Sequence, residues 1–253
     1  MTHRLYRSFQ GLLLLAICIF FAFKAANGQL TWYINSRFIP LTIFGIVFLA
    51  LLSQTVFNEI KRLRREEHER EDHDHHHDHD HDHAPAFLNL WVMLVPLLIG
   101  VLIPARPLDS SAFATKGFNT NSPLVSGDSS AQIFETDSAE RNVLDWIKLF
   151  NYEEDITQFI GQKASVIGFV YFDEILGENR FFVSRFVVSC CSADGFAIAM
   201  VVEWDAAATL EQDSWVLVKG SIDSIQLSNR PSPMIVAESV QAVPIPEQPY
   251  LFP

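Results

Sequence analysis

The 253-residue chain has little cysteine and little positive charge, and each shortage excludes a class of protein. Three cysteines, with Cys190 and Cys191 adjacent, do not make the spaced framework of a disulfide-stapled secreted domain. A formal net charge of -12 argues against a nucleic-acid-binding protein, which normally carries a basic patch. The sequence also lacks a phosphate-binding glycine loop, an HExxH pair and an ordered Ser/His/Asp set, so we expect no enzyme.

Long hydrophobic runs are confined to the first hundred or so residues, although the mean hydropathy of the whole chain is only +0.17. They occupy residues 9–23, 38–57 and 87–104. A bilayer core of about 30 Å needs about 20 helical residues, which the second run supplies. The first and third runs are slightly short, but Lys24 and Arg106 can reach the interface from their ends. We therefore expect two or three transmembrane helices in residues 1–104.

The positive charges beside these runs predict an orientation. One side would carry seven lysines and arginines (Arg4, Arg7, Lys61, Arg62, Arg64, Arg65 and Arg70), and the other four (Lys24, Arg37, Arg106 and Lys116). The positive-inside rule then predicts a multi-pass protein of the inner or plasma membrane, with its N-terminus in the cytoplasm and its C-terminal domain outside. The alternative reading of the first run is a signal peptide cleaved after "ANG", which leaves the later topology unchanged.

Residues 66–83, between the second and third runs, form a His/Asp-rich tract in which the two residue types nearly alternate and which would be cytoplasmic. In an extended chain alternate side chains share one edge, and in a helix residues four apart share a face, so imidazoles can pair on a metal either way. Imidazole beside carboxylate suits zinc best, with cobalt, nickel and copper as further candidates, and we expect no organic cofactor. The alternative is a solvated charged loop. The predicted ligands are His68, His73, His75, His76, His77, His79, His81, His83, Asp74, Asp78, Asp80 and Asp82.

Residues 105–137 are rich in polar and small side chains and predict a linker to a soluble domain at residues 138–253. Asp137 and Glu140 fit a capping box that would begin a short amphipathic helix. Strand-like runs follow at residues 163–172, 180–190, 196–204, 214–222 and 233–243. Five strands, with a short helix expected after the third, predict an all-β OB-like small barrel, and another small antiparallel barrel or sandwich is the alternative.

The adjacent cysteines lie at the expected end of a strand, in "VVSCCSADG", and three interpretations remain open. One is a buried thiol beside an incidental one, since free cysteine often behaves as a small apolar residue. Another is a pair of thiolate ligands for a soft metal, with Asp194 nearby. The third is a strained, reducible disulfide between neighbours, formed in an oxidising compartment.

Together, the helices, the His-rich loop, the polar linker and the segment "RFVVSCCSAD" resemble the YcgQ-like family of bacterial membrane proteins. The resemblance spans nearly the full length, and it carries over Arg185, Cys190, Cys191 and Asp194 as the characteristic motif. Members of this family are regarded as permease subunits of unknown function and are encoded beside a larger multi-spanning permease.

The resemblance therefore implies an accessory subunit of a permease, with a multi-spanning membrane protein and membrane lipid as partners and no nucleic acid. Divalent metal would bind the cytoplasmic His/Asp loop, and the Cys-Cys motif of the outer domain is a further candidate site. Two alternatives remain: a membrane-anchored sensor of thiol state or metal, and an anchor that binds another protein without a role in transport.

Overall fold

The computed structural model describes the chain except residues 1–2, 71–85, 114–132, 134, 154 and 228–229. The described residues form two compact units. One comprises residues up to 30 together with residues 36–106, and we call it the helical unit. The other, which we call the barrel unit, comprises residues 107–253 and also the short segment Thr31–Asn35.

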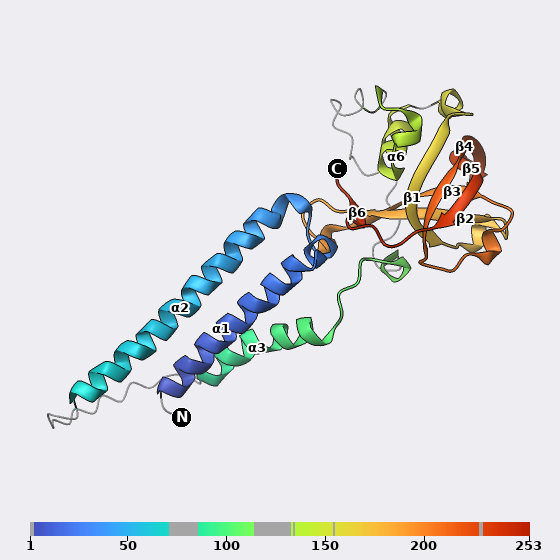
Figure 1. Ribbon diagram of the computed structural model, residues 1–253. Coiled ribbons are helices and arrows are strands. Elements are labelled where there is room, and N and C mark those ends of the chain that lie inside the picture. The colour runs from blue at the N-terminus through green and yellow to red at the C-terminus, as the bar shows by residue number, and fades with distance from the viewer. Residues whose placement is uncertain (1–2, 71–85, 114–132, 134, 154, 228–229) are drawn as a thin grey trace. The chain divides into compact units, whose positions relative to one another are not determined.

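The helical unit contains three apolar helices: α1 (His3–Ala26), α2 (Ile39–Arg70) and α3 (Ala86–Leu102) (Figure 1). The segment Leu5–Ala26 of α1, and the segment Ser36–Arg65 formed by a 3-10 turn and α2, are long and apolar enough to cross a membrane, while Leu90–Leu102 of α3 is a shorter apolar helix. All three predicted runs are therefore helical. Helix α2 continues past its apolar part into the basic residues that follow, so it is longer than the hydrophobic pattern predicts.

Helices α1 and α2 pack closely because a glycine faces the contact. A Cβ atom on Gly11 would lie 3.2 Å from a methyl group of Val56 and 3.3 Å from the ring of Phe57. On the same side, the buried hydroxyl of Ser53 donates a hydrogen bond of 3.1 Å to the carbonyl oxygen of Gly11. Small residues and a hydroxyl-to-backbone bond are typical of helices that associate in a membrane, where apolar burial supplies little driving force.

The barrel unit is an all-β sheet whose first strand pairs with two neighbours and so closes a ring (Figure 1). Around the ring the order is β1-β4-β5-β3-β2, and β2 returns to β1. Pairing is antiparallel except between β3 and β5 and between β2 and the short β6. This closed ring confirms the predicted OB-like barrel. The strands are β1 (Lys163–Tyr171), β2 (Arg180–Val187), β3 (Phe196–Glu203), β4 (Trp215–Leu227), β5 (Arg230–Ala242) and β6 (Tyr250–Leu251).

Glycine permits the close backbone approaches that closure of the ring requires. A Cβ atom on Gly168 of β1 would lie 2.6 Å from the carbonyl oxygen of Ser184 in β2. A Cβ on Gly220 of β4 would lie 2.1 Å from the carbonyl oxygen of Val236, beside a shift in the β4–β5 register. Such irregularities bend a sheet, and here they let a single sheet curl onto itself.

The helix that precedes the barrel begins later than the sequence predicts. The expected capping box at Asp137 and Glu140 is wrong, because Ser138–Glu140 form only a turn of 3-10 helix with Asp137 as its cap. Helix α6 (Val143–Tyr152) has its own capping box, formed by Asn142 and Asp145. Its buried residues, with Trp146 among them, pack into the main core of the barrel unit. The helix expected after β3 is reduced to the 3-10 turn Ala207–Thr209.

Residues just after the membrane helices are part of the barrel unit. Phe113 is buried and stacks on Phe186 of β2, with ring centroids 5.5 Å apart. The backbone N–H and the hydroxyl of Ser110 both donate to the Asp213 carboxylate, at 2.8 and 2.7 Å. The chain thus joins the barrel unit from Pro107 onward.

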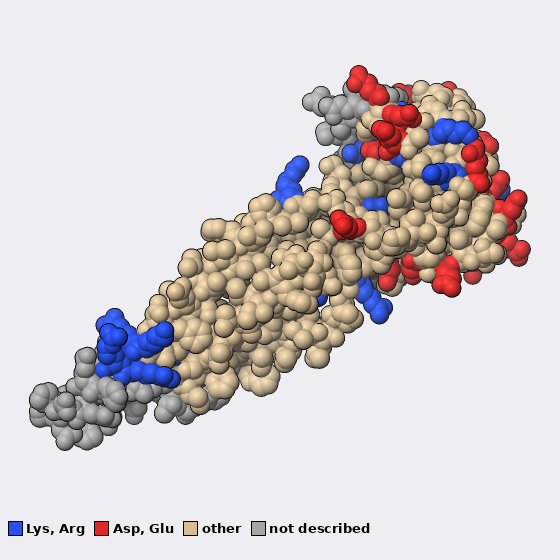
Figure 2. All heavy atoms as spheres, viewed as in Figure 1, with Lys and Arg blue, Asp and Glu red and all other residues tan. Residues whose placement is uncertain are grey.

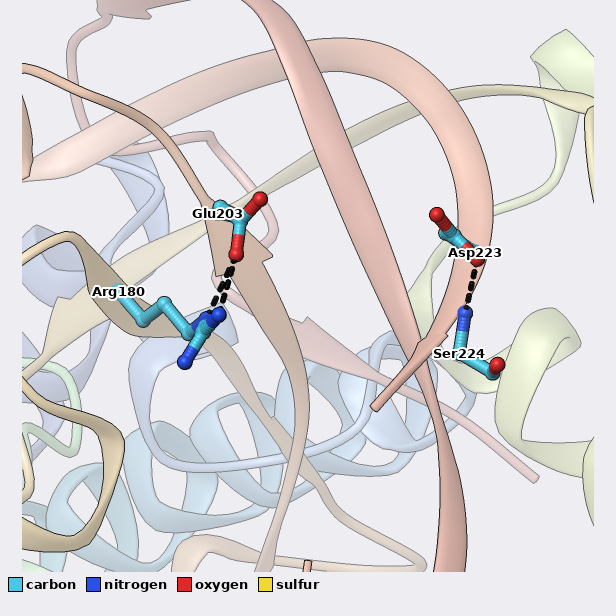
Figure 3. A network of polar contacts seen from close by, with 4 residues as sticks. All are labelled: Arg180, Glu203, Asp223 and Ser224. Atoms are coloured by element: carbon cyan, nitrogen blue, oxygen red, sulfur yellow. Dashed lines mark hydrogen bonds and ion pairs between the residues drawn. The ribbon is translucent and has the colours of Figure 1, made fainter. Parts of the chain in front are cut away.

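The surface of the barrel unit is acidic, as its sequence predicts, and Figure 2 shows carboxylates spread over it. One of the carboxylates forms an ion pair across neighbouring strands. Arg180 of β2 donates from Nε and Nη2 to Glu203 of β3, at 2.8 and 2.6 Å, and the two residues are direct partners in the strand register (Figure 3). A half-exposed pair of this kind contributes about 1 kcal/mol or less.

Candidate functional site

The loop that follows β2 carries both adjacent cysteines and is organised by one carboxylate. Asp194 accepts hydrogen bonds from the backbone N–H of Ser189 (3.1 Å) and of Cys190 (2.7 Å). The loop then closes through a 3-10 turn, Ser192–Asp194, whose Asp194 N–H donates to the Cys191 carbonyl at 3.0 Å. An aspartate that accepts backbone N–H groups supplies bonds that an irregular segment otherwise lacks. The carboxylate therefore fixes the backbone that presents the two thiols.

The two sulfur atoms lie side by side as free thiols. Cys190 Sγ lies 3.7 Å from Cys191 Sγ, and Cys190 is exposed whereas Cys191 is half-buried. A hydrogen bond to the Asp194 carboxylate is the largest influence on the pKa of Cys190, which rises from 9.0 to about 11. Cys190 is therefore almost entirely a neutral thiol at neutral pH, a state that disfavours nucleophilic and redox chemistry.

The pKa of the Asp194 carboxyl group shifts in the opposite direction to the pKa of Cys190. Partial burial acts to raise the pKa of Asp194, but hydrogen bonds from Cys190, Ser189 and Cys191 outweigh it, and the pKa lies below its usual value. Asp194 is thus charged at neutral pH and acts as an acceptor. Among the residues that the structure describes, no group of three or more His, Cys, Asp or Glu side chains is arranged to hold a metal ion.

The same loop binds the segment that connects α1 to α2. Asn35 is buried, and its side-chain amide donates to the Ser189 carbonyl while its backbone N–H donates to the Cys190 carbonyl, each at 3.0 Å. Ile34 forms an antiparallel bridge with Cys191, and the Ser192 N–H donates to the Tyr33 carbonyl at 2.7 Å. Residues 33–35 therefore add a short strand-like partner to the thiol-bearing loop.

A second anchor for this connecting segment is the buried side chain of Tyr250 in β6. Its hydroxyl donates to the carbonyl of Trp32 at 2.9 Å and accepts from the N–H of Leu108 at 3.0 Å. Burial is the main cause that raises the pKa of Tyr250, so the hydroxyl keeps its proton. Thr31 adds a hydrogen bond from its hydroxyl to the carbonyl of Glu247, at 2.8 Å. Tyr250 thus joins the connecting segment, the start of the barrel unit and its last strand.

The fourth residue of the predicted motif, Arg185, serves a different part of the barrel unit. Its guanidinium donates to the carbonyls of Ile167 (3.1 Å) and Gln248 (3.0 Å) and lies 5.1 Å from the centre of the Trp215 ring. Arg185 is buried, and the loss of hydration lowers its pKa to about 10, so it stays protonated at neutral pH. Its contacts tie the chain before β6 to the barrel, whereas Cys190, Cys191 and Asp194 are gathered in one loop.

The other predicted site residues fall mainly outside the described part of the chain. His68 lies within α2, and the remaining histidines and aspartates of the tract, residues 73–83, are outside the described residues. Conversely, sequence reasoning missed Asn35 and Tyr250. Tyr250 lies in the proline-rich terminal segment "PIPEQPYLFP", and neither residue carries a local signal of its distant partners.

These features define a class of protein with an apolar helical unit, an OB-like barrel, and a barrel loop bound to the connection between two helices. The DUF1980 N-terminal domain model matches residues 9–119, and the DUF1980 C-terminal domain model matches residues 117–253. The chain belongs to the DUF1980 family.

Two curated relatives match over most of their lengths. UPF0703 protein YcgQ of Bacillus subtilis is 29% identical over 282 residues, which cover 96% of this chain and 99% of the relative. A Streptococcus mutans protein named "Putative two-component membrane permease complex subunit" is 24% identical over 267 residues, covering 89% of this chain and 92% of the relative. The resemblance to YcgQ-like proteins is thereby confirmed.

The arrangement of Asp194 and Cys190 predicts how thiol reactivity responds to a single substitution. In a chain whose Cys18 and Cys191 are replaced by serine, Asp194→Asn removes the charge beside Cys190 and retains a hydrogen-bond acceptor. The pKa of Cys190 should fall, because the hydrogen bond to the Asp194 carboxylate is the largest cause that raises it. The thiolate fraction then increases at every pH below the pKa, and the lower intrinsic nucleophilicity of the thiolate offsets part of this gain, so alkylation by iodoacetamide should be several-fold faster.

The control is Asp173→Asn, because the Asp173 carboxylate likewise accepts a hydrogen bond from a backbone N–H, that of Ile175, but does so at a different turn of the barrel unit. It should leave the alkylation rate of Cys190 unchanged. The prediction is contradicted if Cys190 is alkylated at the same rate and with the same pH midpoint whether residue 194 is aspartate or asparagine. The carboxylate would then not control the reactivity of the thiol.

Proposed function

We propose that this chain is a non-catalytic accessory subunit of a two-component membrane permease. The name of the Streptococcus mutans relative is the observation that carries the proposal, since that relative matches along most of both chains. The two apolar helices support a membrane location. The chain would bind a multi-spanning subunit through its helices and present the barrel unit on the outer side of the membrane.

The connecting segment supports this topology through the number of times the chain must cross the membrane. Thr31–Asn35 belong to the barrel unit, so the connection between α1 and α2 lies on the same side of the membrane as residues 107–253. If α2 crosses the membrane, the chain must cross back before Pro107. Helix α3 is the apolar helix available for this, and its 17 residues span about 25 Å, which modest thinning of the bilayer or the reach of Arg106 accommodates.

The positive-inside rule then assigns the sides. The basic residues Lys61–Arg65 follow the apolar part of α2, and Figure 2 shows Lys and Arg side chains gathered at that end of the helical unit. Basic residues next to a membrane span favour the cytoplasm. The N-terminus and the His/Asp tract would therefore be cytoplasmic, and the barrel unit would be extracytoplasmic.

A role in metal handling is the finer part of the proposal. Seven histidines and five aspartates nearly alternate within residues 72–83, before α3, and a tract of this composition can bind divalent ions such as zinc in more than one conformation. Tethered at the membrane, it would raise the local concentration of ions beside the permease. The Cys190 thiol is a weaker candidate ligand, because its raised pKa opposes the deprotonation that metal binding needs.

The proposed topology predicts opposite labelling of two positions. In a cysteine-free chain, Glu178→Cys on the exposed surface of the barrel unit should react with a membrane-impermeant maleimide in intact cells. Glu66→Cys, in the charged part of α2, should react only after the cells are permeabilised. Labelling of both positions from the same side would rule out the arrangement of three membrane crossings.

The proposed partnership predicts co-purification. When the tagged chain is expressed with the multi-spanning permease that the family resemblance implies as its partner, the two should be recovered from mild detergent in a constant ratio, whichever subunit carries the tag. An unrelated multi-spanning membrane protein expressed at the same level provides the control and should not be recovered. Absence of the permease from both purifications would exclude the proposed function.

The metal proposal predicts a pH-dependent titration. The full chain should bind several zinc ions weakly, and replacement of the eight histidines at positions 68–83 by alanine should abolish most of this binding. Binding should fall as the pH drops below about 6.5, because protonated imidazole cannot bind a metal. The variant with Cys190 and Cys191 replaced by serine serves as the control and should retain the binding. Equal zinc binding by the alanine variant would contradict this role for the tract.

A further inference from the structure

One face of α2 carries a regular row of exposed side chains, which we call the α2 stripe. Its members are separated by three or four residues, so they lie on one side of a helix with 3.6 residues per turn. Ile43 and Val47 are 50% and 52% exposed, and the others are also exposed. The stripe comprises Ile43, Val47, Ala50, Gln54, Asn58, Lys61 and Arg65.

The stripe is separate from the face that packs on α1. The α1 contact uses Ser53, Val56 and Phe57, as described above, and Ile60 is buried with them. Gln54 follows Ser53 by one residue and is therefore turned by about 100° from this contact. The described residues of the helical unit thus leave the stripe uncovered.

Gln54 distinguishes this stripe from an ordinary lipid-facing surface. Its amide has two donor hydrogens and an acceptor oxygen, and no described residue forms a hydrogen bond with it. It lies seven residues before Lys61, or about 10 Å along the helix axis, within the apolar part of the span. Side chains of a helix tilt toward its N-terminus, so the amide is directed away from the interface at Lys61. Hydrocarbon leaves such an amide unsatisfied, whereas a neighbouring helix can bind it.

The charges at the end of the stripe argue against a second copy as the occupant. Two copies in one membrane are parallel, so contact through this face would bring Lys61 and Arg65 of one copy against the same cations of the other. Like charges in contact oppose association. A different helix with a hydrogen-bonding group opposite Gln54 and carboxylates opposite Lys61 and Arg65 would satisfy both requirements, and the small side chain of Ala50 permits its close approach.

We propose that the α2 stripe is the surface that binds a transmembrane helix of the multi-spanning permease subunit. This inference rests on the proposed function and adds to it the contact surface and the chemistry of the partner helix. The partner helix carries a polar side chain at the depth of Gln54 and acidic residues near its cytoplasmic end.

Crosslinking in native membranes tests whether the α2 stripe is the face of the helix that contacts the permease subunit. A photoreactive amino acid is placed at Val47, in the stripe, or at Phe48, which is equally exposed (52%) on another face. The full chain is expressed with the same multi-spanning permease subunit as in the co-purification. Position 47 should crosslink to that subunit, identified by mass spectrometry, and position 48 should give only lipid adducts. A product of twice the chain's mass, or lipid adducts alone, from position 47 would overturn the proposal.

Substitutions test the two chemical requirements. Gln54→Leu should lower recovery of the permease subunit about threefold, the typical effect of one hydrogen bond between membrane helices, while membrane insertion is unchanged. Thr55→Val is the matched control on another face, since the Thr55 hydroxyl already bonds to the Leu52 carbonyl at 2.8 Å. Lys61→Glu with Arg65→Glu should lower recovery further, whereas Arg64→Glu should not.

These outcomes separate the inference from the proposed function. If the unmodified chain recovers the permease subunit but Gln54→Leu and Thr55→Val behave alike, this surface is wrong and the proposed function stands. If the unmodified chain recovers no permease subunit, both fail.

Discussion

The attachment of Thr31–Asn35 to the barrel unit is the constraint on which the organisation of this protein depends. Asn35 donates from its side chain and its backbone to consecutive carbonyls of the thiol-bearing loop, and Tyr250 binds the carbonyl of Trp32. Buried groups such as these cost about 1–3 kcal/mol each when left unpaired, so the contact resists separation. Because α1 ends before this segment and α2 begins after it, the barrel loop holds the connection between two apolar helices.

This attachment changes the meaning of the "CCSAD" motif. From the sequence, Cys190 and Cys191 are candidates for thiol or metal chemistry. In the structure, the backbone of the same loop also binds the segment that connects α1 to α2. The Asp194 carboxylate carries a negative charge and fixes the backbone of the loop through two hydrogen bonds. It also raises the pKa of Cys190 and so keeps this thiol protonated. The motif therefore has a structural reason to exist, independent of any ligand.

Much of the fold could be predicted from the sequence because its signals are local. Apolar runs gave the helices, and β-branched alternation with turn residues gave the strands and the OB-like ring. The helix start was misjudged because Asp137 and Asn142 both fit a cap, and the difference lies in which following residues become buried against the barrel. Cys190, Cys191 and Asp194 lie in one loop because they are neighbours in the chain. Asn35 and Tyr250 were missed because their partners are more than a hundred residues away.

By itself the sequence determined the segments that suit lipid, the acidity of the barrel unit and the polar groups available near the membrane. These properties follow from the composition and from the repeat of apolar residues every two positions in a strand or every 3.6 positions in a helix. A single segment contains each of these patterns without reference to the rest of the chain. The tertiary structure decided that a five-residue connection belongs to the barrel, that one carboxylate organises both thiols, and that Gln54 faces away from α1. Each of these depends on hydrogen bonds and packing between distant segments, whose pairing no local pattern specifies.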